Sequence, residues 1–151
     1  KGVEMVSKEK REIALQIKSV NNLIRRNLDI RFAEAGLGEL AGMQGPILGF
    51  LQKEGQQREI FQKDLEKRFN IRRSTATVML QNLEQKGYIV REAVHSDARM
   101  KRIVLTQKAI QHNLAIRDQI DAFNKELEEG LTSEEKKMFL RILDKIKKNL
   151  E

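Results

Sequence analysis

Apolar residues recur at helical spacing over three long stretches, one near the start of the sequence and two near its end. Over residues 7–35 they are three or four residues apart, which places them on one side of a helix that two following glycines would end. A second stripe covers 106–129, again before a glycine. The third, 132–150, opens with Thr132 and Glu135 at the spacing of a capping box. These stripes could be buried against each other or against a second copy of the chain.

The central region begins with a shorter apolar helix. A helix is predicted over 43–53, with Pro46 in its first turn, where a missing N–H group costs little. Gly45 and Gly49 weaken this helix by about 1 kcal/mol each relative to alanine. Close backbone packing is the favoured interpretation of these glycines, and a deformable wall beside a cavity is the alternative. A short extended segment, 59–61, follows.

Two further helices are predicted next, over 62–69 and 71–86, with Asn70 between them. Asparagine accepts the left-handed backbone geometry that ends a helix, and a glycine closes the second helix. Apolar residues at positions i, i+3, i+4 and i+7 of the second helix give it one buried face, and the small side chain of Ala76 lets the two helices cross closely. The pattern predicts a helix-turn-helix, whose second helix enters the DNA major groove. The buried face consists of Ala76, Met79, Leu80 and Leu83.

The opposite face of this second helix carries side chains suited to DNA. Gln and Asn pair with adenine, Arg pairs with guanine, and the methyl groups of Thr and Val contact the thymine methyl group. Hydroxyl groups and free N–H groups at the helix start suit phosphate oxygens. An ordinary helical hairpin with a polar outer face would show a similar pattern. The candidate DNA-binding residues here are Arg72, Arg73, Ser74, Thr75, Thr77, Val78, Gln81 and Asn82.

A β-hairpin is predicted directly after this helix, as in the wing of a winged helix. Its strands are 88–94 and 103–105, joined by a polar loop over 95–102. Arg99 is suited to a narrow, electronegative minor groove, and Asp97 is placed to hold its guanidinium by a bidentate pair. A solvated surface charge is the alternative for Arg99. The candidate DNA-binding residues of the hairpin are Asp97, Arg99, Lys101 and Arg102.

The charge distribution favours a nucleic-acid partner for this central region. The 151 residues carry 29 Lys and Arg against 22 Asp and Glu, a net charge of +7. Residues 56–105 hold eleven of the basic and six of the acidic residues, and therefore +5 of that charge. Neutralised phosphates supply much of the affinity of DNA-binding proteins, so this asymmetry suits a DNA-binding face. A solvated basic surface is the alternative.

Composition excludes several kinds of chemistry. The sequence has no cysteine, so it has no disulfide, no thiol redox switch and no zinc site with cysteine ligands. His95 and His112 are its only histidines, which are too few for a metal-sensing site. We expect His95 to lie at the base of the wing and His112 to be an exposed helix residue. No glycine-rich phosphate loop and no nucleophile in a recognisable context occur. We therefore expect neither an enzyme nor a cofactor.

The sequence also argues against a membrane protein. Its longest uncharged run, 40–52, is too short and too rich in glycine to span a bilayer. No leader segment is recognisable, which predicts a soluble cytoplasmic protein. The lysine-rich last helix could bind a membrane surface, although its apolar face is better explained as a dimer core. Those lysines are Lys145, Lys147 and Lys148.

Short motifs along nearly the whole chain resemble one family. They are Leu40-x-x-x-Gln44-x-x-x-Leu48, Gln62-Lys-Asp-Leu65, Ser74-Thr-Ala-Thr77, Leu83-Glu-x-Lys-Gly-Tyr-Ile89, Asp97-x-Arg99-x-Lys101-x-Ile-x-Leu-Thr106 and Leu131-Thr-x-Glu-Glu135. Together they resemble the multiple-antibiotic-resistance regulator (MarR) family of winged-helix transcription factors. The hairpin motif is the most specific of them.

The resemblance implies a mainly α fold of the α+β type: a winged helix-turn-helix with long dimerisation helices at both ends. It implies a single domain, 1–151, with a dimerisation part over 7–35 and 106–151 and a DNA-binding lobe over 40–105. It further implies a homodimer on a palindromic operator of double-stranded DNA, acting as a repressor. A small, often phenolic or anionic, effector would bind between the dimer helices and the lobe and change the spacing of the two recognition helices.

Three departures from the family pattern change these expectations. Arg72 stands where the family commonly has a serine helix cap, and Val78 and Asn82 stand where it often has arginine, so the usual contacts there are in question. The absence of cysteine excludes the branch that senses peroxides. A helical protein-interaction module without specific DNA binding is the alternative function.

Overall fold

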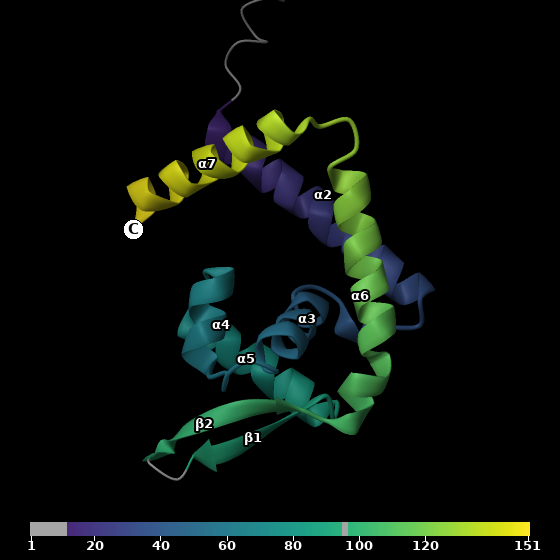
Figure 1. The fold of residues 1–151 in the computed structure, drawn as a ribbon, viewed down its shortest axis with the longest axis vertical. Helices are drawn as coiled ribbons and strands as arrows, with labels where there is room; N and C mark the ends of the chain where they lie inside the picture. Colours follow the sequence, from purple (N-terminus) through teal and green to yellow (C-terminus); the bar gives the residue numbers. More distant parts are fainter. Residues whose placement is uncertain (1–11, 95–96) are drawn as a thin grey trace, which may run out of the picture. The chain divides into compact units, whose positions relative to one another are not determined.

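The first long helix contributes the buried side chain of Phe32 to the core (Figure 1). This computed structural model describes residues 12–94 and 97–151. Helix α2 (Ile13–Glu34) matches the first predicted helix, although residues 7–11 of that prediction lie outside the described residues. The 3₁₀ helix η1 (Gly38–Leu40) packs against α2, and α3 (Gln44–Glu54) follows with Pro46 in its first turn.

Close packing, one of the two interpretations of the α3 glycines, is confirmed at Gly45. A Cβ atom added there would lie 2.4 Å from Cζ of Phe32, whose side chain is fully buried in α2. Glycine is therefore required for the ring to lie directly against the backbone of α3. This contact joins α2 to the start of α3.

The two helices of the predicted helix-turn-helix are present with nearly the predicted bounds. Helix α4 covers Gln62–Phe69 and α5 covers Arg73–Gln85, and the two pack against each other. Asn70 has a φ of 49°, the left-handed geometry that ends α4. Within α5, Ala76, Leu80 and Leu83 are buried, whereas Met79 is only half-buried.

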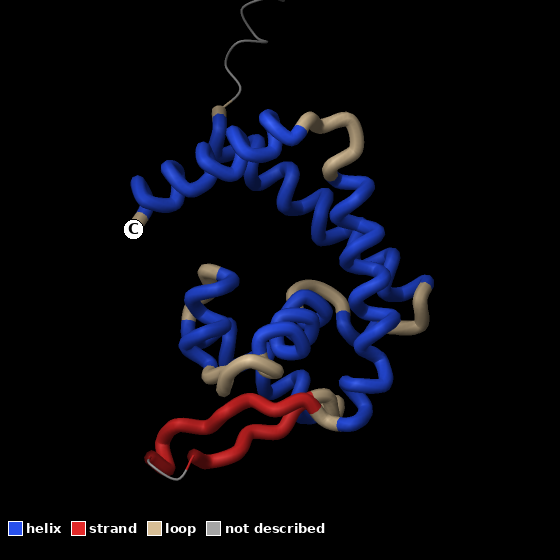
Figure 2. Tube along the Cα trace, viewed as in Figure 1, coloured by secondary structure: helices blue, strands red, loops and turns tan. Residues whose placement is uncertain are grey.

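An antiparallel two-stranded sheet forms the wing (red in Figure 2). Strand β1 is Ile89–Val94 and β2 is Asp97–Leu105, so β2 begins six residues before the predicted start of the strand. The predicted loop over 95–102 is therefore wrong for 97–102. These residues pair across the sheet, Lys101 with Ala93 and Arg102 with Glu92. The charged composition of 97–102 does not indicate a strand, but the pairing of Arg102 with the opposite charge of Glu92 stabilises one.

The last two helices are α6 (Gln107–Leu127) and α7 (Ser133–Leu150). Thr132 and Glu135 form the predicted capping box at the start of α7, with reciprocal bonds of 3.1 and 2.8 Å. The chain divides into two compact units with the boundary inside α6, between Gln119 and Ile120. Among the residues described, no helix is long and apolar enough to cross a membrane.

Candidate nucleic-acid interface

Helix α5 presents most of its candidate DNA-binding residues to solvent. Arg72, the residue before the helix, makes no side-chain cap, in line with its departure from the family's serine. It is exposed, as are Arg73, Ser74, Thr75 and Gln81, and Asn82 is half-buried. Val78 is 55% exposed although it is apolar. An apolar side chain on an otherwise polar exposed face suits a thymine methyl group.

Thr77, another candidate on α5, is half-buried and uses its hydroxyl group within the protein. That hydroxyl donates to the backbone oxygen of Arg73 at 2.9 Å and accepts from Nε2 of Gln62 at 3.0 Å. Nε2 of Gln62 is also 3.2 Å from the Arg73 oxygen. Three polar groups thus join the start of α4 to the first turn of α5. Thr77 therefore holds the two helices together through its hydroxyl group.

The wing shows a different arrangement of Asp97 and Arg99 from the predicted one. Oδ1 of Asp97 accepts a hydrogen bond from the backbone N–H of Arg99 at 2.9 Å. The predicted bidentate pair with the guanidinium is wrong, since the ion pairs of the described residues do not include one between these two side chains. The carboxylate instead holds the backbone within the first residues of β2. Arg99 is exposed and keeps its guanidinium available for a ligand.

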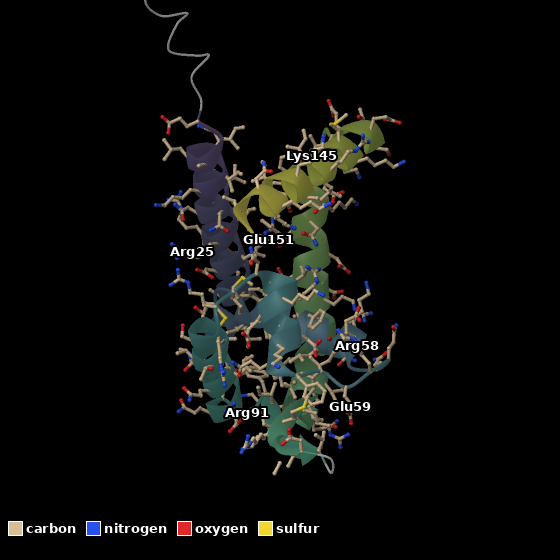
Figure 3. The ribbon with its side chains drawn as sticks, turned by 90° about the vertical axis from the view of Figure 1, so that its left-hand side faces the viewer. Arg25, Arg58, Glu59, Arg91, Lys145 and Glu151 are labelled. Carbon is tan, nitrogen blue, oxygen red and sulfur yellow. The ribbon has the colours of Figure 1, made fainter. Side chains whose placement is uncertain are left out.

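A basic groove of about 600 Å³ lies between α4, α5 and the wing. Its walls carry five basic side chains and one acidic side chain, Glu66. Arg91, labelled on β1 in Figure 3, is held by Glu84 at 2.7 Å. Lys63 and Arg91 were missed by the sequence analysis, because only the sheet register and the crossing of the helices bring them beside the other three. The five basic residues are Lys63, Arg73, Arg91, Arg99 and Lys101.

Arg102, the last candidate, is engaged by two carboxylates. Its Nη2 lies 2.8 Å from Oε2 of Glu92, and its Nη1 lies 3.2 Å from Oε1 of Glu59. Hydrogen bonding to Glu92 is the main cause that raises the pKa of Arg102 above its usual value. The structure therefore places Arg102 apart from the basic groove, in an ion-pair network.

A polar junction supports the root of the wing. The hydroxyl group of buried Tyr88 donates to the carboxylate of Glu39 in η1. The ammonium group of Lys108 in α6 lies 4.4 Å from the centre of the Tyr88 ring and 3.4 Å from Oε1 of Glu39. Nζ of Lys86, at the end of α5, donates to Gln44 at 2.9 Å. The junction thus joins η1, α3, α5, the wing and α6.

The junction also determines the environment of three titratable groups. Burial is the main cause that raises the pKa of Tyr88, and the bond to Glu39 adds to it. The same bond is the main cause that lowers the pKa of Glu39. His112 stacks edge-on against Tyr88, with ring centres 5.8 Å apart, and its Nδ1 is 2.8 Å from the oxygen of Lys108. The prediction that His112 is exposed is therefore wrong, and His95 lies outside the described residues.

The described residues include no group of three or more His, Cys, Asp or Glu side chains that could hold a metal ion. A helix-turn-helix followed by a basic wing defines the class of winged-helix proteins.

Comparisons with known proteins agree with this class. A model of the MarR family matches residues 39–100. The transcription regulator MarR from Oenococcus oeni is 30% identical and has a TM-score of 0.78, with 91% of this chain and 99% of that chain covered. A MarR-family regulator from Listeria monocytogenes, solved with a 26-mer DNA, is 25% identical with a TM-score of 0.76, over 93% of this chain and 89% of that one.

A curated relative extends the similarity. An HTH-type transcriptional regulator from Bacillus subtilis, YdgJ, is 26% identical over 142 residues, which are 94% of this chain and 81% of the relative. The chain belongs to the MarR family and is a DNA-binding transcriptional regulator.

Proposed function

We propose that the chain is a homodimeric repressor that binds a palindromic operator through α5 and the wing and leaves it when a small molecule binds. The observation that carries the proposal is the basic groove between α4, α5 and the wing. Arg73 and Thr77 of α5 and Arg99 of the wing all line it.

In this proposal the α5 residues read the major groove. Val78, Gln81 and Asn82 contact base edges, because amide side chains pair with adenine and an apolar side chain suits the thymine methyl group. Arg72, Arg73, Ser74 and Thr75 bind phosphates, which fix the position of the protein on the duplex but carry little sequence information. Arg99 enters the neighbouring minor groove.

The basic groove would hold the phosphate backbone between these two contacts. Lys63 and Lys101 make no ion pair among the described residues and can therefore neutralise phosphates. Arg73 and Arg99 contribute from α5 and the wing. Counterions released by these contacts would make binding fall steeply with salt concentration.

Exposed apolar faces support the proposed dimer. Helix α7 has no buried residue, and Phe139 on its apolar stripe is 57% exposed. Apolar surface of this extent on a helix is typical of an interface. We assign dimerisation to 7–35 and 106–151 and DNA binding to 40–105. The other apolar residues exposed on α2 and α7 are Ile13, Leu15, Ile17, Val20, Leu23, Ile30, Met138, Leu140, Ile142 and Leu150.

Release by an effector follows from the same organisation. A small molecule shifts the spacing of the two recognition helices only if it binds one arrangement more tightly than the other. The proposal includes no cofactor and no enzymatic activity, since the relatives in the comparisons are transcription regulators. A regulator acts where the chromosome lies, so we place the protein in the cytoplasm.

The experiment is selection of a binding site from a random-sequence duplex library, followed by fluorescence anisotropy titration of the selected duplex. We expect a palindromic site with a dissociation constant of about 10⁻⁸ to 10⁻¹¹ M at physiological salt, weakening as salt increases. Failure to enrich any sequence, together with no salt-dependent binding, would contradict specific DNA binding. Protein partners retained after nuclease treatment would then favour the interaction module.

A further inference from the structure

The register of the wing separates its basic residues onto two faces. Residues directly opposite each other in an antiparallel sheet share a face, and successive residues alternate. Ile103 pairs with Arg91, and Lys101 pairs with Ala93, on the face that contributes to the basic groove. Arg102 pairs with Glu92, on the opposite face. Arg102 therefore points away from the groove although Lys101 beside it lines the groove.

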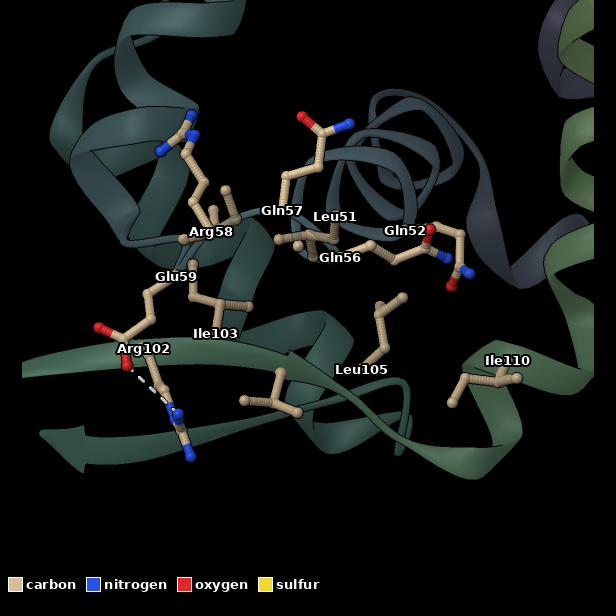
Figure 4. A pocket seen from close by; sticks show the side chains of 13 residues that line it. Leu51, Gln52, Gln56, Gln57, Arg58, Glu59, Arg102, Ile103, Leu105 and Ile110 are labelled. Atoms are coloured by element: carbon tan, nitrogen blue, oxygen red, sulfur yellow. Dashed lines mark hydrogen bonds and ion pairs between the residues drawn. The ribbon is translucent and has the colours of Figure 1, made fainter.

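The side chain of Arg102 connects three segments that are distant in sequence. It belongs to β2, Glu92 belongs to β1, and Glu59 belongs to the segment before α4. Figure 4 shows the carboxylate of Glu59 next to the guanidinium of Arg102, with the ion pair between them drawn as a dashed line. One residue further along β2, the N–H of Ile103 donates to the oxygen of Ile60 at 2.8 Å. These two contacts attach β2 to the segment just before α4.

We infer that Arg102 is a wing-positioning residue, which with Glu92 and Glu59 holds the wing at the angle at which Arg99 meets the DNA. This inference rests on the proposed function, and it removes Arg102 from the candidate DNA contacts that the sequence suggested. The clamp is the set Glu59, Glu92 and Arg102. Arg102 lies only three residues after Arg99 on β2, so a change of wing tilt at the clamp displaces the Arg99 guanidinium.

The sign of the change in DNA affinity when Glu92 loses its charge distinguishes the clamp from a phosphate contact by Arg102. Removing the carboxylate of Glu92 takes a negative charge away from a DNA-binding lobe, which by simple electrostatics strengthens binding. If Glu92 positions the wing through Arg102, its removal weakens binding instead. The side chains of Arg102, Glu92 and Glu59 are 43%, 45% and 54% exposed, so the effect is modest, about two- to fivefold in affinity.

The experiment measures the affinity of the full chain for the selected duplex at several salt concentrations. The variants are Arg102→Gln, Glu92→Gln and the double variant. We expect each single variant to bind about two- to fivefold more weakly and the double variant to bind no more weakly than Arg102→Gln. The slope of log affinity against log salt stays as in the wild type for Arg102→Gln, because no phosphate contact is lost.

Arg58→Gln is the matched control. Arg58 is 47% exposed, forms an ion pair with Asp64 at 3.1 Å, and lies outside the wing, so its loss reports the general effect of one cation fewer. Melting curves of all variants show that a weaker affinity is not due to unfolding. Even if Arg102→Gln did not fold, Glu92→Gln alone would decide by the sign of its effect.

Two results would overturn the clamp. One is a Glu92→Gln variant that binds as tightly as the wild type or more tightly. The other is a fall of about 0.9 in the salt slope of Arg102→Gln, the value for one lost phosphate contact. Both leave the proposed function intact, whereas wild-type protein that binds no duplex overturns the proposed function itself.

Discussion

Two single residues, Gly45 in the core and Arg99 in the wing, have different physical roles. Position 45 requires glycine because the Phe32 ring occupies the space that a side chain would fill. At Arg99 the backbone N–H donates to Asp97, while the guanidinium is exposed. We expect Gly45 to be required for stability and Arg99 for DNA binding, and a substitution at each position separates the two.

Replacing Arg99 with glutamine is expected to weaken operator binding about tenfold or more, because a desolvated charge contact in the minor groove is lost. The slope of log affinity against log salt should fall by about 0.9. Anisotropy titration at several salt concentrations measures both. Wild-type affinity with an unchanged slope would show that the wing does not contact DNA.

Replacing Gly45 with alanine is expected to lower the free energy of unfolding by about 1–3 kcal/mol, because the added methyl group overlaps the buried Phe32 ring. Urea denaturation followed by circular dichroism measures the loss. The double variant Gly45→Ala, Phe32→Leu is the control, since a smaller side chain makes room for the methyl group. If alanine cost no more in the wild type than beside leucine, the contact would not be the reason for glycine.

At the scale of elements, the sequence predicts helices better than the wing. The bounds of α4, α5 and α7 follow from apolar spacing and end signals such as Asn70, all of which act within a few residues. Strand β2 is concealed because the charged residues before Ile103 are stabilised by partners on β1 and before α4, which local composition does not show. The Tyr88–Glu39 bond spans 49 residues and needs the tertiary fold.

The same distinction applies to the candidate site. The α5 residues could be identified from one helical face, whereas Lys63 and Arg91 reach the basic groove only through the packing of α4 and the register of β1. For Arg102 the sequence prediction erred in the other direction. Its neighbours in sequence suggested a DNA contact, whereas its ion pair with Glu92 argues against one.

The junction predicts a pH dependence of stability. The lowered pKa of Glu39 means that its carboxylate stabilises the fold above the ordinary value of 4.5, and this contribution is lost as pH falls through the folded pKa. The raised pKa of Tyr88 means that its contribution is present below 10 and is lost as pH rises through the folded pKa. The Tyr88→Phe variant should therefore be less stable than wild type between about pH 5 and 10, by about 0.5–1.5 kcal/mol.

Denaturation of both proteins from pH 3 to 10 measures the difference in the free energy of unfolding, which should shrink below pH 4.5. His112 and the ammonium groups of Lys86 and Lys108 also lie at the junction, and they are common to both proteins. A difference that is constant from pH 3 to 8 would contradict the role of the Glu39 carboxylate.

For the molecule as a whole, the proposed binding to a palindromic operator requires a second copy of the chain. Phe139 lies on an exposed apolar stripe of α7, and a charge buried in an interface without a partner is strongly unfavourable. Phe139→Glu is expected to raise the dimer dissociation constant about tenfold or more and to weaken operator binding with it. Lys148→Gln, the same charge change on the opposite side of α7, is the control.

Size-exclusion chromatography at several concentrations follows the change. If Phe139→Glu remained as dimeric as Lys148→Gln, the apolar stripe of α7 would not form the dimer.

Sedimentation velocity of the protein with the selected operator duplex tests most sharply whether a dimer binds DNA. We expect a complex with two 17.5 kDa chains per duplex, which dissociates as salt increases and forms with the palindrome but not with a single half-site at the same concentration. One chain per duplex, or equal binding of the half-site and the palindrome, would contradict it.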